Sequence, residues 1–236
     1  MRTFLVSILL VTMMVAAASA ELLTTANPIG KGGWAIMGAG VQDQNVSNNS
    51  SYNMTTLGGY VGYGITDKLD AYIQAGSSTV GGLPTSFGIQ VKGALTSIGL
   101  TAKYTLMDEA AGSPVSVALG AGYRTLNTTM TIPGANPTPP PAIIAVDSTT
   151  SGNQTMIGVG VSKIIVPFVP YAGLAYRSTT QSGNAVSTQM DLTIGTAIAW
   201  SMQGAVFAEY TMQSITPNGG SAYSSGQIGV GVGYKI

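Results

Sequence analysis

The chain lacks cysteine and histidine altogether, and each absence excludes a class of chemistry. Without cysteine there is no disulfide, no thiolate metal site and no lipid-acceptor cysteine after a signal peptide. Without histidine the chain has neither the commonest general base nor the commonest metal ligand. We therefore expect a protein that is not an enzyme and that has no cofactor, no metal site and no catalytic residues.

Charged residues and long apolar runs are also scarce. Asp, Glu, Lys and Arg make up 8% of the 236 residues, against about 25% in a soluble domain, and the mean hydropathy is +0.32. The formal net charge is +0, so nothing attracts nucleic acid electrostatically. No run of about 18 apolar residues follows residue 20, which argues against a transmembrane helix. A β-barrel remains as the way for such a chain to enter a membrane.

The first twenty residues have the pattern of a secretory signal peptide. Arg2 is the positive residue, Phe4–Ala18 the apolar region and Ala18-Ser19-Ala20 the cleavage site. An uncleaved transmembrane anchor is the alternative, but the apolar run is shorter than the ~20 residues that a spanning helix needs. We expect residues 1–20 to be removed and residues 21–236 to form one domain.

What the chain does contain is glycine, 32 residues, spread through segments in which apolar side chains alternate with small or polar ones. A period of two places the apolar set on one face of a strand, as in Val115–Thr125. Strands are expected at Gly33–Val41, Tyr52–Ile65, Leu69–Gly76, Thr96–Leu106, Val115–Thr125, Thr155–Ile164, Tyr171–Ser178, Thr188–Trp200, Gly204–Gln213 and Gln227–Ile236. Lys163 breaks the alternation, and either reaches the water interface or marks a bulge.

Short turns alternate with longer connections between these strands. The longer ones are expected to be loops: Gln42–Ser51, Ser77–Ala94, Asn127–Gly152, Thr179–Ala185 and Ile215–Tyr223. The pattern predicts an all-β fold, a closed antiparallel up-and-down transmembrane β-barrel of about ten strands, with eight or twelve as alternatives. Both termini then lie on the short-turn, periplasmic side. A secreted soluble β-sandwich is the competing fold, but it would carry more polar residues on its solvent face.

The hairpin Tyr63–Tyr72 and the closing strand Gly229–Ile236 resemble those of small outer membrane β-barrel proteins of Gram-negative bacteria, the OmpA-like and opacity-type group. The resemblance implies a bacterial outer membrane location and contact with outer membrane lipid. It also implies recognition of the C-terminal strand, residues 227–236, by the barrel assembly machinery. Similar proteins usually end on Phe or Trp, whereas this chain ends on Ile236. Enzymes of this fold rely on a catalytic histidine, which is missing here.

Two sets of residues are the candidate site. The alternation directs seven charged side chains into the lumen: Asp70, Lys103, Arg124, Arg177, Asp191, Glu209 and Lys235. They are expected either to pair as a salt-bridge network that fills the barrel or to form the constriction of a pore. Aromatic residues near the short turns are expected at the membrane interface, with a sugar-binding platform as the alternative: Trp34, Tyr63, Tyr104, Phe168, Tyr171, Trp200 and Tyr234.

The sequence supports more than one function. The leading hypothesis is a non-enzymatic outer membrane barrel, either structural or a narrow channel for small solutes. The alternative is a surface attachment protein that binds a ligand through its long loops, above all Asn127–Gly152 with the apolar tip of Pro133–Val146.

Overall fold

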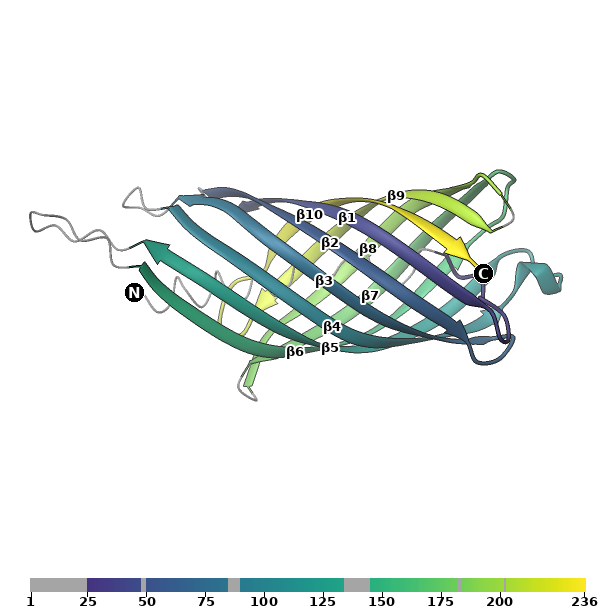
Figure 1. Cartoon of the computed structure of the whole chain (residues 1–236), viewed down its shortest axis with the longest axis horizontal. Helices are drawn as coiled ribbons and strands as arrows, with labels where there is room; N and C mark the ends of the chain where they lie inside the picture. The colour runs from purple at the N-terminus through teal and green to yellow at the C-terminus, as the bar shows by residue number, and fades with distance from the viewer. Residues whose placement is uncertain (1–24, 48–49, 85–89, 134–144, 182–183, 202) are drawn as a thin grey trace, which may run out of the picture.

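A computed structural model describes residues 25–47, 50–84, 90–133, 145–181, 184–201 and 203–236, which form a closed antiparallel β-barrel (Figure 1). Its strands are β1 (Trp34–Ser47), β2 (Ser50–Gly64), β3 (Leu69–Pro84), β4 (Gln90–Met107), β5 (Ser116–Pro133), β6 (Ala145–Ser162), β7 (Phe168–Gln181), β8 (Asn184–Ala199), β9 (Gly204–Pro217) and β10 (Tyr223–Lys235). Each strand pairs with its sequence neighbours, and β1 pairs with β10, so the predicted ten-stranded up-and-down barrel is confirmed and the β-sandwich is wrong. No helix among the described residues could span a membrane.

Alternation along each strand sorts side chains between lumen and outer surface, as a period of two requires. In β9, burial alternates residue by residue from Phe207 to Ile215. Phe207, Glu209, Thr211 and Gln213 are buried in the lumen, whereas Val206, Tyr210 and Met212 are exposed on the outer wall. The two faces therefore have the composition expected of a barrel in lipid, with the polar side chains inside.

The strands are longer than the sequence analysis expected. Segments predicted as loops are largely strand: β3 runs on to Pro84, β5 to Pro133 and β6 begins at Ala145. Gln42–Ser51, Ser77–Ala94, Asn127–Gly152 and Thr179–Ala185 must be corrected in this way. The predicted loop Ile215–Tyr223 is confirmed for residues 218–222, which lie between the end of β9 and the start of β10. In β3, β5 and β6 the exposed outward residues of these parts include Ser77, Thr79, Asn127, Thr129, Ser151 and Asn153, so the apolar alternation ends before the strand does. The central part of the predicted apolar loop tip, residues 134–144, lies outside the described residues.

The apolar part of the outer wall is a belt next to the short turns. In β4 the exposed apolar residues run from Leu106 to Ile98, and the outward position after them is Thr96. A run of nine residues at about 3.3 Å each and a tilt of about 40° spans roughly 23 Å along the barrel axis. This matches the apolar band of about 25 Å in membrane barrels, so the strands continue beyond it toward the end of the barrel where β1 connects to β2 and β3 connects to β4.

Candidate functional site

The lumen holds six of the seven charged residues that the alternation directs inward. Asp70, Lys103, Arg124, Arg177, Asp191 and Glu209 are all buried. Lys235 stands on the last position of β10, where its side chain is exposed at the short-turn mouth. Its inward direction follows the alternation of Gln227 and Gly229 on the same strand, but its exposed position at the mouth contradicts a place in the buried charge network.

Two ion pairs join four of these six charges. Lys103 Nζ lies 3.4 Å from Asp70 Oδ2 near the short-turn mouth, and Arg177 Nε lies 2.6 Å from Asp191 Oδ2 deeper in the lumen. The second pair is almost completely enclosed, since the two side chains are 1% and 2% exposed. Water cannot compensate charge at this depth, so each partner depends on the other.

Uncharged polar side chains complete the lumen. Arg124 Nη2 donates a hydrogen bond to Gln154 Oε1 at 2.6 Å, and Gln154 Nε2 donates to Thr179 Oγ1 at 2.9 Å. This chain crosses β5, β6 and β7 and fixes the position of a fully buried guanidinium group. The described residues contain no cluster of acidic side chains that could hold a metal ion.

Tyr171 belongs to the lumen rather than to the membrane interface, so its prediction was wrong. It is 5% exposed and donates a hydrogen bond of 2.9 Å to Glu209 Oε2. Tyr171 and Arg177 are an even number of residues apart on β7, and side chains at that separation share a face. The opposite Gly195 leaves room for the ring, because a Cβ there would lie 2.5 Å from Tyr171 Cζ.

The other six predicted interface aromatics are exposed on the outer wall beside the short turns: Trp34, Tyr63, Tyr104, Phe168, Trp200 and Tyr234. The rings of Trp34 and Tyr63 are in contact, with centroids 4.8 Å apart. A second set of aromatic residues, which was not predicted for the membrane interface, is exposed farther along the strands: Tyr123, Tyr176 and Tyr210. Because the outward residues beyond Tyr123 and Tyr176 are Thr125 and Ser178, these tyrosines mark the other edge of the belt.

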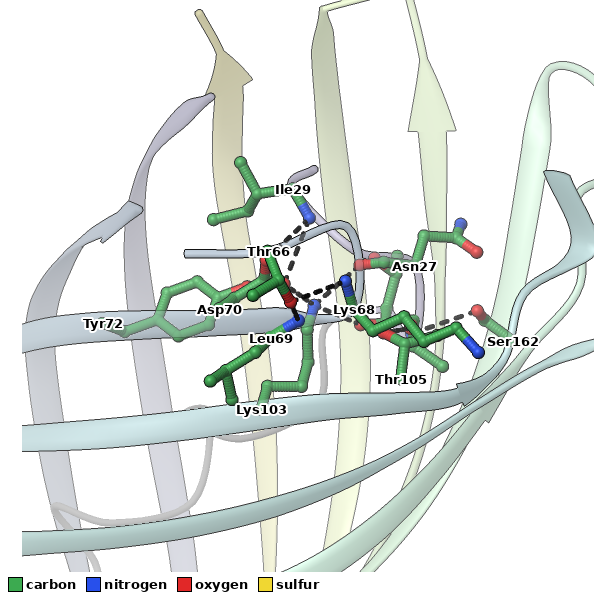
Figure 2. A network of polar contacts seen from close by, with 12 residues as sticks. Asn27, Ile29, Thr66, Lys68, Leu69, Asp70, Tyr72, Lys103, Thr105 and Ser162 are labelled. Carbon is green, nitrogen blue, oxygen red and sulfur yellow. Dashed lines mark hydrogen bonds and ion pairs between the residues drawn. The ribbon is translucent and has the colours of Figure 1, made fainter. Parts of the chain in front are cut away.

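The short-turn mouth is occupied by the chain itself. Residues 25–30, here called the N-terminal strap, precede β1 and lie across the mouth (Figure 2). Ala26 and Ile29 of the strap are buried. Gly64 is the point of closest approach, because a Cβ there would lie 1.9 Å from the Gly30 carbonyl oxygen. Only glycine at position 64 lets the strap pass.

Asp70 and Lys103 are the centre of the contacts to the strap (Figure 2). The backbone N–H of Ile29 donates to both carboxylate oxygens of Asp70, at 3.2 and 3.1 Å. Lys103 Nζ donates to the carbonyl oxygens of Thr25 and Asn27, at 3.3 and 2.7 Å. Both charges were predicted from the sequence, but their backbone partners were not, because nothing in residues 25–30 signals a binding segment.

Two turns are joined outside the barrel, which explains Lys163. The residue follows the end of β6, and its Nζ lies 2.9 Å from Glu109 Oε1 of the short helix η1 (Glu109–Ala111). The Ile164 N–H donates to Glu109 Oε2 at 2.7 Å. The pairing of β6 with β5 and with β7 has no register shift. Of the two alternatives, the contact at the water interface is therefore correct.

The turn contact predicts a pH dependence. The Ile164 N–H and then the Lys163 ammonium hold the pKa of Glu109 below its ordinary value of 4.5. A lowered pKa in the folded state means that this stabilisation is complete above pH 4.5 and is lost as the pH falls through the lowered pKa. We expect hydrogen exchange to show the Ile164 amide losing its protection in that acidic range. Glu109→Gln, which cannot ionise, should abolish the pH dependence; an unchanged profile would contradict this assignment.

Comparison with known proteins shows the fold. No protein-family model and no curated protein matches the chain. The translocator domain of the autotransporter NalP from Neisseria meningitidis is similar in structure, with a TM-score of 0.56 and 13% identity over 87% of this chain and 88% of that one. The β domain of the Bordetella autotransporter BrkA has a TM-score of 0.55 and 13% identity over 86% and 99% of the two chains. At the level of fold, the resemblance to outer membrane β-barrels is confirmed.

Proposed function

We propose that the chain is a non-enzymatic β-barrel of the bacterial outer membrane whose lumen is closed to ions and whose role is structural. The observation that carries the proposal is the filled lumen. Large inward side chains are buried at every level of the belt: Tyr60, Tyr72, Lys103, Arg124, Gln154, Met156, Tyr171, Arg177, Asp191, Phe207, Glu209 and Gln227. A pore that conducts needs a continuous water-filled path, which buried side chains do not leave.

The outer membrane location rests on the apolar belt and its two aromatic edges, together with the barrel fold. Two expectations belong to this proposal. Removal of residues 1–20 as a signal peptide would deliver the chain across the inner membrane. Recognition of residues 227–236 by the barrel assembly machinery would then insert it, with β10 closing the barrel against β1.

Planar bilayers test whether the lumen is closed. We expect the refolded chain to give no conductance steps, because the inward side chains and the N-terminal strap fill the path. Heat-modifiable migration of the same sample in detergent gels is the control that a folded barrel was inserted. Regular conductance steps from a folded, unmodified chain would contradict the proposal and favour the narrow channel.

A second candidate is surface attachment, favoured by one observation. The strands continue beyond the apolar belt, and most of their described outward residues there are uncharged and polar: Thr55, Ser77, Thr79, Thr96, Asn127, Thr129, Ser151 and Asn153. Backbone pairing between neighbouring strands continues through this part, so the connections at this end of the barrel start beyond the belt. Cells that display the chain should adhere to a ligand surface, and replacing residues 134–144 by an equally long Gly-Ser linker should abolish adhesion. Equal adhesion by the unmodified chain and the linker variant would show that residues 134–144 are not part of the ligand site.

A further inference from the structure

We infer that the short-turn mouth of the barrel is a binding site for a short peptide, read through the peptide backbone, and that residues 25–30 occupy it as a tethered ligand. This inference concerns the mouth alone and goes beyond a structural role for the barrel. It does not depend on whether the barrel is closed to ions.

Among the described residues, the hydrogen bonds from barrel side chains to the strap go to backbone atoms of the strap. Besides the contacts of Asp70 and Lys103, Thr105 Oγ1 donates to the Ala26 carbonyl oxygen at 3.2 Å. The Ala26 N–H donates to Ser162 Oγ at 3.1 Å. Side chains from β3, β4 and β6 thus bind consecutive peptide groups without reading the strap's polar side chains. Such a site recognises the path of the peptide backbone.

The site also has two places for side chains. Ala26 is 1% exposed and Ile29 is 5% exposed, so the enclosed positions take a small and a branched apolar residue. A Cβ on Gly62 would lie 2.8 Å from Ile29 Cδ1, so the wall fits closely around that side chain. The ligand class is therefore a peptide with a small residue and, three positions later, a branched apolar residue.

The barrel keeps the two charged groups in place without help from the strap. Asp70 pairs with Lys103 at 3.4 Å and accepts a hydrogen bond of 3.2 Å from Tyr72 Oη. The ammonium group of Lys103 lies 5.5 Å from the centroid of the Tyr72 ring. When the strap leaves, Asp70 and Lys103 still pair with each other, so its departure leaves no buried charge unpaired. Occupation of the mouth can therefore be reversible.

A single introduced cysteine reports whether the strap is in place, because the chain has no cysteine of its own. In the refolded full chain, Ala26→Cys should react slowly with a soluble maleimide, since position 26 is enclosed. Lys31→Cys, at an exposed position, should react fast and gives the rate without protection. Equal rates at the two positions would overturn the inference.

Two second-site variants on the Ala26→Cys background test how the strap is held. Ile29→Pro removes the N–H that Asp70 accepts and should speed labelling at least about tenfold, the loss expected for one hydrogen bond to a charged group. Ile29→Ala, which keeps the N–H, is its control for side-chain loss. Gly64→Ala should release the strap by overlap with Gly30, whereas Gly38→Ala, whose Cβ would meet nothing closer than 4.0 Å, should not. If Ile29→Pro and Gly64→Ala were labelled as slowly as their controls, recognition through the backbone would be overturned.

Binding in trans tests the ligand class. A fluorescent peptide of residues 25–33 should bind the Ile29→Pro barrel saturably. It should bind the unmodified chain at least about tenfold more weakly, because the tethered strap competes at an effective concentration in the mM range. A peptide N-methylated at the residues corresponding to Ala26 and Ile29 should lose at least about tenfold in affinity, because both recognised N–H groups are gone. Equal affinity for the two peptides, or no binding to the Ile29→Pro barrel, would overturn the inference.

Discussion

Asp191→Ala lowers the free energy of unfolding of the refolded barrel by about 3–5 kcal/mol, the cost of leaving one member of a buried ion pair without its partner. The Arg177 side chain is 1% exposed, so loss of Asp191 leaves a guanidinium group inside the wall without the carboxylate that lies 2.6 Å from it. Gln189 Nε2, which donates to Asp191 Oδ1, loses its acceptor as well. Denaturant unfolding of the barrel in lipid vesicles measures the change.

The matched control removes both charges. Asp191→Leu combined with Arg177→Met keeps most of the side-chain volume, and replacement of a buried pair by apolar residues is often neutral or stabilising. We expect the double variant to recover most of the stability that Asp191→Ala loses. A double variant as unstable as Asp191→Ala would show that packing, rather than an unpaired charge, governs this part of the lumen.

Strand number, closure and the direction of charged side chains could be predicted because all three follow from alternation. Asp70, Lys103 and Asp191 each stand between apolar outward residues, so a period of two places them inside the barrel. The pairing of these charges could not be predicted, because it depends on register. Asp70 lies opposite Lys103, whereas Arg177 reaches Asp191 from opposite Gln189.

The strand ends and the strap could not be predicted from alternation, for a different reason. Past the belt the outward residues of β5 change from Tyr123 to Thr125, Asn127 and Thr129, so the apolar signal disappears while the backbone ladder continues. The strap binds through its peptide groups, which every residue carries. The predicted segments were defined by the hydrophobicity of their side chains. Neither the strand ends nor the strap can be recognised from that quantity.

The change in the outward residues predicts where on β4 a charged residue is strongly destabilising, because a bilayer tolerates a charge only near its interfaces with water. Ala102 points outward midway between Leu106 and Ile98, the ends of the apolar set on β4. Ala102→Arg should lower the free energy of unfolding in lipid vesicles by about 2–4 kcal/mol, as expected for arginine near the bilayer midplane. Denaturant unfolding from vesicles measures the loss.

Ala94→Arg provides the matched control, since Ala94 lies on the same strand and the same outward face but beyond Thr96. An arginine there meets water or lipid headgroups, so its effect should stay within about 0.5 kcal/mol. Equal losses at positions 94 and 102 would mean that the hydrocarbon layer covers both positions, and the belt would then be wrongly placed. A large loss at position 102 alone would mean that β4 rises above the membrane before it ends, which would carry the connection between β3 and β4 clear of the lipid.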